Sequence, residues 1–126
     1  MGYVQAKITL SNPSDPKLKP ITTIALVDSG ALFLCIPQHI AVQLKLNELD
    51  KREVTIAAGS KKLVPYVGPV KVNFENRNCF VGAMILGDEV LLGAIPLEDM
   101  DLVIEPAKRK LTVNPDSPNF ASAKVK

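Results

Sequence analysis

The sequence predicts a mainly-β domain, and three observations lead to this prediction. Ten prolines and seven glycines among 126 residues indicate many turns and short elements. Hydrophobic residues make up 47% of the chain but aromatic residues only 5%, so the core must consist mostly of Val, Ile, Leu and Ala. Short apolar runs bounded by turn residues recur along the chain, as strands do. The length suits one domain with a buried core.

The N-terminal third predicts three strands followed by a helix. The strands are expected at residues 3–10, 22–27 and 32–36, the last of them apolar throughout. Residues 11–20 contain three X-Pro steps and predict a loop, because the residue before a proline avoids helical geometry. Pro37 suits a first helical turn, and apolar residues follow it at helical spacing.

The rest of the chain predicts hairpins and one further helix. A hairpin is expected over residues 53–67 with Gly59 at its turn, and residues 95–102 predict a short helix. Further strands are expected at residues 70–74, 80–86, 89–92, 103–104 and 110–113. Residues 116–126 have little apolar content and are expected to form a flexible C-terminal tail, which leaves residues 1–115 as the folded domain.

Charge and hydropathy exclude several partners. The net charge is only +2 and the basic residues are scattered in short groups, so no nucleic-acid partner is expected. Residues 1–10 lack the pattern of a signal peptide, and no apolar run approaches membrane-spanning length. We therefore expect a cytoplasmic protein without a membrane partner.

The two cysteines, Cys35 and Cys79, both lie among apolar neighbours. Buried free thiols are favoured, and a disulfide between them stays open. His39, the only histidine, follows Cys35 closely, but no Asn or Asp is placed to orient it as a thiol nucleophile would require. Two ligands do not close a zinc shell, so no metal is expected.

The most informative segment is Asp28-Ser29-Gly30-Ala31, which follows the apolar run at residues 24–27. A carboxylate at the end of a buried strand is costly unless something uses it. A second apolar strand, at residues 90–92, runs into Gly93-Ala94 without an acid. No other aspartate follows an apolar strand and precedes Ser/Thr-Gly: Asp15, Asp50, Asp88, Asp99, Asp101 and Asp116 lie in turns or on a helix.

These two segments resemble the signatures of retropepsin-like aspartic proteases. Residues 27–31 are similar to the Asp-Thr/Ser-Gly-Ala signature, and residues 90–93 are similar to the second, apolar-apolar-Gly signature. Order and spacing agree from about residue 3 to residue 115, and the details most resemble the single-domain prokaryotic type, which is related to the retroviral proteases. The resemblance implies a retropepsin-like closed β-barrel, mainly β, with one or two short helices.

The resemblance also implies roles for individual residues. Asp28 would be the catalytic carboxylate. Three neighbours would support the active site: the Ser29 hydroxyl by hydrogen-bonding across to a partner's backbone, Gly30 by letting the chain turn, and Ala31 by lying beside the cleft. The tip of the flap, which would contact substrate, would comprise Ala57, Ala58, Gly59 and Ser60. Leu32 and Ala94 are neutral where viral members carry an acid and an Arg.

The implied activity is that of an aspartic endopeptidase, a peptide hydrolase that acts without a cofactor. Because the chain offers one suitable Asp, catalysis would need a homodimer in which Asp28 from each subunit forms a dyad that activates water. The substrate would be an extended peptide lying as a strand beneath the Gly59 hairpin. Two alternatives stay open: a non-catalytic dimerisation or peptide-binding module on a protease fold, and a protein that cleaves only its own tail.

Overall fold

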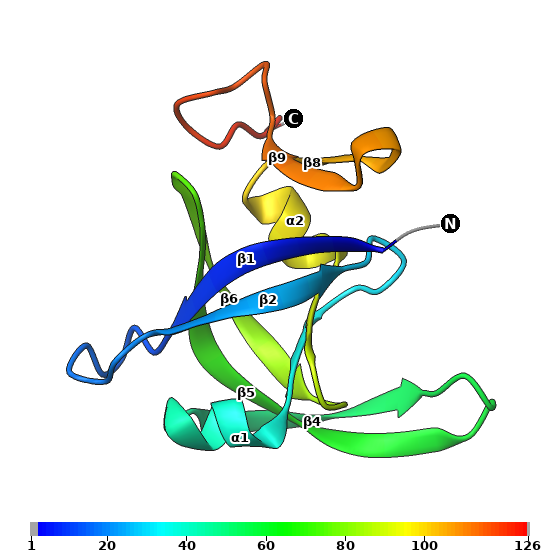
Figure 1. Ribbon diagram of the computed structural model, residues 1–126. Helices are drawn as coiled ribbons and strands as arrows, with labels where there is room; N and C mark the ends of the chain where they lie inside the picture. The colour runs from blue at the N-terminus through cyan, green and yellow to red at the C-terminus, as the bar shows by residue number, and fades with distance from the viewer. Residues whose placement is uncertain (1–2, 126) are drawn as a thin grey trace.

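The strands of this protein are wound into a ring, with a short helix at either end (Figure 1). The computed structural model describes residues 3–125. Its elements in chain order are β1 (Val4–Ser11), β2 (Ile21–Val27), β3 (Leu34–Ile36), α1 (Gln38–Gln43), β4 (Asn47–Thr55), β5 (Lys61–Phe74), β6 (Arg77–Ile85), β7 (Val90–Leu92), α2 (Ala94–Asp99), β8 (Leu102–Glu105), the 3-10 turn η1 (Pro106–Lys108) and β9 (Lys110–Val113).

The main sheet closes on itself. Its strand order is β1-β2-β7-β3-β6-β5-β4, and an additional pairing of β1 with β5 joins the ring. Six strands therefore form a closed barrel, while β4 pairs only with β5 and lies outside the ring. The predicted mainly-β closed barrel with short helices is confirmed. Closure removes the free edges of the six barrel strands, and β4 keeps one unpaired edge.

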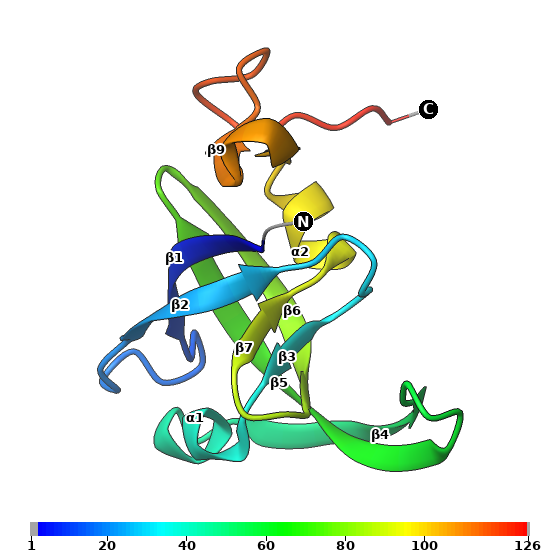
Figure 2. The same cartoon turned by 45° about the vertical axis from the view of Figure 1, so that its right-hand side comes forward.

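The core fills the barrel with branched aliphatic side chains, as the composition predicts. Ile8, Leu10, Leu34, Ile36 and Leu92 are almost fully buried. The two helices and the residue that follows each of them add Ile40, Ala41, Leu44, Leu97 and Met100 to the same cluster. Figure 2 shows α1 and α2 at opposite ends of the barrel. Burying each large aliphatic side chain stabilises the fold by about 1.5–3 kcal/mol before conformational entropy is subtracted.

The third predicted strand starts later in the structure than expected. The strand expected at residues 32–36 begins only at Leu34, and the side chain of Leu32 is 55% exposed. The physical reason is that the carbonyl groups of Ala31 and Leu32 accept hydrogen bonds from the first two N–H groups of α2, at 2.8 and 2.9 Å. Their backbone is thus committed to a helix terminus instead of a neighbouring strand.

The hairpin predicted around Gly59 is confirmed and is longer than predicted. β4 begins at Asn47, and the strands expected at residues 61–67 and 70–74 are one strand, β5, which continues through Gly68-Pro69 with a register shift. Most residues of β4 are exposed, so no apolar alternation marks its start. At the tip, the N–H of Gly59 donates to the carbonyl of Ile56 at 2.8 Å, and Gly59 has φ = +86°.

The C-terminal hairpin, β8 with β9, forms a separate two-stranded sheet beside α2, as expected for residues 103–113. The segment that follows it is hydrogen-bonded to the domain. The side chain of Arg77, the first residue of β6, donates to the carbonyl of Ser117, and the side chain of Asn76, in the turn before β6, donates to the carbonyl of Pro118. The boundary after residue 115 and the flexibility of residues 116–126 stay predictions, and residue 126 lies outside the described range.

Asp101 is the second anchor of the C-terminal segment. Its carboxylate accepts hydrogen bonds from the Asn114 side chain at 3.0 Å, from the Ser117 hydroxyl and from the backbone N–H of Ser122 at 3.0 Å. The hydrogen bonds from the Ser117 and Asn114 side chains lower the pKa of Asp101 to about 2, with smaller help from Arg77.

Within residues 3–125, no helix is both long enough and apolar enough to cross a membrane.

Candidate active site

The two signature segments lie side by side because β2 and β7 are neighbouring parallel strands. Val27 is paired with Leu92, so the two strands end at the same level. Asp28 is the first residue beyond β2, and its N–H donates to the carbonyl of Leu92 at 3.0 Å. This hydrogen bond joins the turn at residues 28–31, which carries the acid, to the turn at residues 93–94, which does not.

The Asp28 carboxylate is exposed but oriented. The N–H of Gly30 donates to Oδ1 of Asp28 at 2.9 Å, and the N–H of Ala31 donates to the Asp28 carbonyl at 3.1 Å. A Cβ built on Gly30 would lie 3.1 Å from Oδ1, so a residue without a side chain suits this turn. In the part of the chain that the structure describes, no side chain or N–H bonds Oδ2, which leaves that oxygen open to solvent or a ligand.

Gly93 allows the second turn to pack directly on the first. A Cβ at Gly93 would lie 2.4 Å from the carbonyl oxygen of Phe33 and 2.9 Å from that of Ala31, far inside van der Waals contact. The same close approach lets the first N–H groups of α2 reach the carbonyl groups of Ala31 and Leu32. Backbone contacts with Gly93 and the start of α2 therefore support the loop that carries Asp28.

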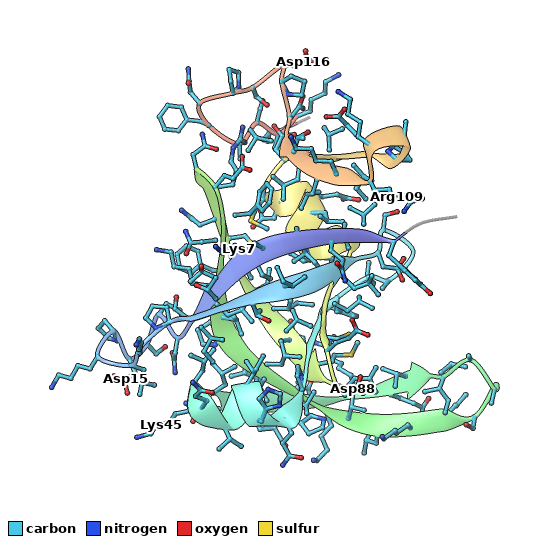
Figure 3. All side chains as sticks on the ribbon, in the orientation of Figure 1. Lys7, Asp15, Lys45, Asp88, Arg109 and Asp116 are labelled. Atoms are coloured by element: carbon cyan, nitrogen blue, oxygen red, sulfur yellow. The ribbon has the colours of Figure 1, made fainter. Side chains whose placement is uncertain are left out.

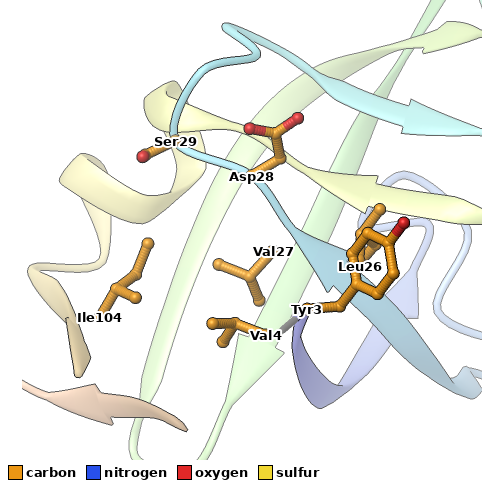
Figure 4. A pocket seen from close by; sticks show the side chains of 7 residues that line it. All are labelled: Tyr3, Val4, Leu26, Val27, Asp28, Ser29 and Ile104. Carbon is orange, nitrogen blue, oxygen red and sulfur yellow. The ribbon is translucent and has the colours of Figure 1, made fainter. Parts of the chain in front are cut away.

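A hollow of about 410 Å³ adjoins the Asp28 turn (Figure 4). It lies between the N-terminal strand, the end of β2 and β8, and it is lined by Tyr3, Val4, Leu26, Val27, Asp28, Ser29 and Ile104. In Figure 4 the Asp28 carboxylate points away from the apolar side chains of Val4 and Ile104. The hollow thus has an apolar floor beside an exposed carboxylate.

The structure brings together four of the predicted site residues and leaves the other four apart. Residues 28–31 form one turn, whereas Ala57, Ala58, Gly59 and Ser60 are exposed at the free end of the β4–β5 hairpin and do not line the hollow. Figures 1 and 2 show that hairpin end and the β2–β3 loop on the same side of the molecule. The role of the hairpin tip in binding substrate stays a prediction.

The thiols do not form an alternative site. Cys35 and Cys79 are both buried and unpaired. Burial raises the pKa of Cys35, and burial together with the nearby Asp99 raises the pKa of Cys79 to about 12, so neither thiol favours the nucleophilic thiolate. His39 is exposed on α1. Across residues 3–125, no group of three or more His, Cys, Asp or Glu side chains is arranged to hold a metal ion.

A cluster that sequence reasoning missed joins the hairpin to the Asp28 loop. The guanidinium carbon of Arg52, on β4, lies 4.2 Å from the centre of the Tyr66 ring and 5.7 Å from that of Phe33. The two rings meet edge to face at 6.1 Å. The alternation along β4 could have placed Arg52 on the same face as Val54, but its aromatic partners lie far away in sequence.

The chain is similar to the solution structure of the simian foamy virus (mac) protease, with a TM-score of 0.47 and 16% sequence identity over 72% of this chain and 90% of that chain. No protein-family model matches the sequence. No curated protein matches it either.

Proposed function

We propose that this protein is a homodimeric aspartic endopeptidase. The observation that carries the proposal is the Asp28 carboxylate, which is exposed at the end of a buried strand with one oxygen held by the Gly30 N–H and the other open. A turn that orients a carboxylate outward without neutralising it suits an acid-base group better than a structural ion pair.

The chemistry requires a second carboxylate. Two aspartates about 3 Å apart cannot both ionise cheaply, so they share one proton, as the dyads of aspartic proteases do. The ionised member takes a proton from a bound water while the protonated member donates to the scissile carbonyl oxygen. Because each chain has one such aspartate, the dyad would form between two copies related by a two-fold axis.

Apolar surface near Asp28 supports a second copy as the partner. The hollow has Val4, Leu26, Val27 and Ile104 in its wall, and Tyr3 at its edge is 79% exposed. In the proposed dimer, the Ser29 hydroxyl hydrogen-bonds to the partner's backbone. An extended peptide then lies between the dyad and the hairpin tip at residues 57–60.

The test is cleavage of an unfolded protein between about pH 4 and 6, the range in which a shared proton is expected. Wild-type protein should cleave it, and Asp28→Asn should reduce the rate by at least about a hundredfold because the acid-base group is lost. Asp15→Asn is the matched control, since Figure 3 shows Asp15 in the loop between β1 and β2 and its carboxylate forms no ion pair or hydrogen bond with any residue from 3 to 125. Binding of a statine-type inhibitor gives an independent readout.

Absence of both cleavage and inhibitor binding by a wild-type dimer would overturn the proposal. That result would favour the alternative function, a non-catalytic dimerisation or peptide-binding module, which needs no catalytic dyad. Cleavage confined to the protein's own C-terminal segment would appear as a change of intact mass over time at acidic pH.

A further inference from the structure

Arg52 is a cation fixed at the junction of the hairpin and the Asp28 loop. It lies on β4 with its side chain on the face that also carries Val54, and its guanidinium is stacked over Tyr66 of β5. Phe33, which contacts both Arg52 and Tyr66, comes five positions after Asp28. The cluster thus bridges the two parts of the chain between which a substrate peptide is proposed to lie.

The stack leaves most of the hydrogen-bonding capacity of Arg52 unused. Its one ion pair within residues 3–125 is with Asp50, from Nε to Oδ2 at 3.5 Å, and its terminal nitrogens make no hydrogen bond to any described residue. The side chain is 40% exposed and is therefore accessible to a ligand from solvent. A guanidinium held over an aromatic ring loses little further freedom when its remaining N–H groups bind a carboxylate.

The platform under Arg52 is itself rigid. Tyr66 packs so closely against Gly82 of β6 that a Cβ there would lie 2.2 Å from the ring carbon Cζ. Tyr66 therefore cannot shift toward the barrel to release Arg52. The neighbouring apolar residues Val64 and Met84 belong to the same hydrophobic cluster as Tyr66 and Phe33.

We propose that Arg52 determines specificity by binding an acidic side chain of the substrate, on the side of the scissile bond that runs toward the base of the β4–β5 hairpin. This inference rests on the proposed function, because it assumes that a peptide passes between Asp28 and the hairpin. The preferred substrate class is therefore an extended peptide with Glu or Asp at one position and apolar residues around the cleaved bond.

The test separates binding from cleavage. The probes are short fluorescent peptides with a central Leu-Leu pair, made in pairs that differ only by Glu or Gln at one other position. Their affinity for Asp28→Asn protein is measured by fluorescence anisotropy at about pH 5.5, where Glu is ionised. At one position the Glu peptide should bind about tenfold more tightly than its Gln partner, as one charge-assisted contact allows. The preference should weaken as salt is added, because the site is partly exposed.

Lys51→Gln is the matched control for Arg52→Gln. Lys51 is the adjacent cation on β4 and pairs with Glu48 at 3.3 Å on the exposed side of the strand. Arg52→Gln should abolish the Glu preference, Arg52→Lys should retain part of it, and Lys51→Gln should retain all of it. Equal affinities for the Glu and Gln peptides at every position, or an equal loss of preference in both glutamine variants, would overturn the inference.

The same peptides distinguish this inference from the proposed function. If wild-type protein cleaves nothing but Asp28→Asn protein shows an Arg52-dependent Glu preference, the endopeptidase proposal fails and the recognition role stands. If cleavage occurs, the KM for the Glu peptide should rise about tenfold in Arg52→Gln with a much smaller change in kcat, as expected for uniform binding. Cleavage without any Glu preference leaves the endopeptidase proposal intact and removes the role of Arg52.

Discussion

Gly93 supports the loop that carries Asp28 through close contact with the backbone of residues 31–33. Its φ of −90° is open to any residue, so the requirement for glycine is purely steric. Gly93→Ala would place a methyl group 2.4 Å from the Phe33 carbonyl and force the two turns apart. We expect the free energy of unfolding to fall by about 2 kcal/mol, the usual cost of overpacking. Chemical denaturation measures this change.

Gly87→Ala provides the comparison for Gly93→Ala. Gly87 has φ = +80° with no atom within 4 Å of a built Cβ, so its substitution tests the conformational cost alone, about 1 kcal/mol. Gly93→Ala should cost more, and it alone should reduce peptide cleavage. Equal stabilities of the two variants would show that the close contact at Gly93 relaxes freely.

Asp101 makes stability depend on pH in a defined direction. Its pKa is about 2 in the folded protein and about 3.9 when unfolded, so the unfolded chain binds the proton first. The stabilisation is therefore complete above about pH 4 and is lost as the pH falls toward 2. The anchor of the C-terminal segment should consequently persist in the acidic range proposed for catalysis.

Asp101→Asn tests this prediction because Asn tolerates the left-handed backbone at this position, where φ = +55°. The variant should be less stable than wild type at pH 7, and the difference should shrink between about pH 4 and 2. Asp116→Asn is the control, since Asp116 lies in the same segment and its carboxylate takes part in no hydrogen bond there. A difference in urea midpoint that is constant with pH would contradict the assigned pKa.

At the scale of elements, the β4–β5 hairpin differs from the barrel that it extends. β4 pairs with β5 alone, and residues 55–63 are exposed, whereas β5 and β6 share long pairing and bury Val70, Val72 and Cys79. Backbone amides at the hairpin end should therefore exchange with solvent much faster than those of the β5–β6 pair. Hydrogen exchange followed by mass spectrometry measures this, and equal protection would exclude a mobile hairpin end. Binding of a statine-type inhibitor should raise the protection selectively at residues 56–60.

For the whole molecule, the central prediction concerns subunit mixing. If each active site takes one aspartate from each copy, an equal mixture of wild-type and Asp28→Asn protein at fixed total concentration should retain about one quarter of the wild-type activity after exchange, because only wild-type pairs form a dyad. A site within one chain would retain about one half. Mixing with Asp15→Asn should cause no loss.

Local sequence patterns predicted most of the helices and strands but misplaced the starts of two strands. The hairpin at Gly59 and the apolar runs around Ile8 and Leu92 carry their own turn and strand signals, and they fold as predicted. The early start of β4 at Asn47 and the late start of β3 at Leu34 were missed. The start of β4 is set by its pairing with β5, and the start of β3 is set by hydrogen bonds from α2 to the preceding residues. Neither partner is close in sequence, so no local pattern encodes these boundaries.

By itself, the sequence determined that this protein is mainly β, that its core is aliphatic, and that Asp28-Ser29-Gly30-Ala31 is a turn at the end of a buried strand, because these follow from local propensity and periodicity. Only the tertiary structure decided that β1 pairs with β5 to close the barrel, that Gly93 packs against the Asp28 loop, and that Arg52 stacks on Tyr66 beside Phe33. The physical reason is that closure, close backbone approach and stacking join residues far apart in the chain, so they depend on how the whole barrel packs.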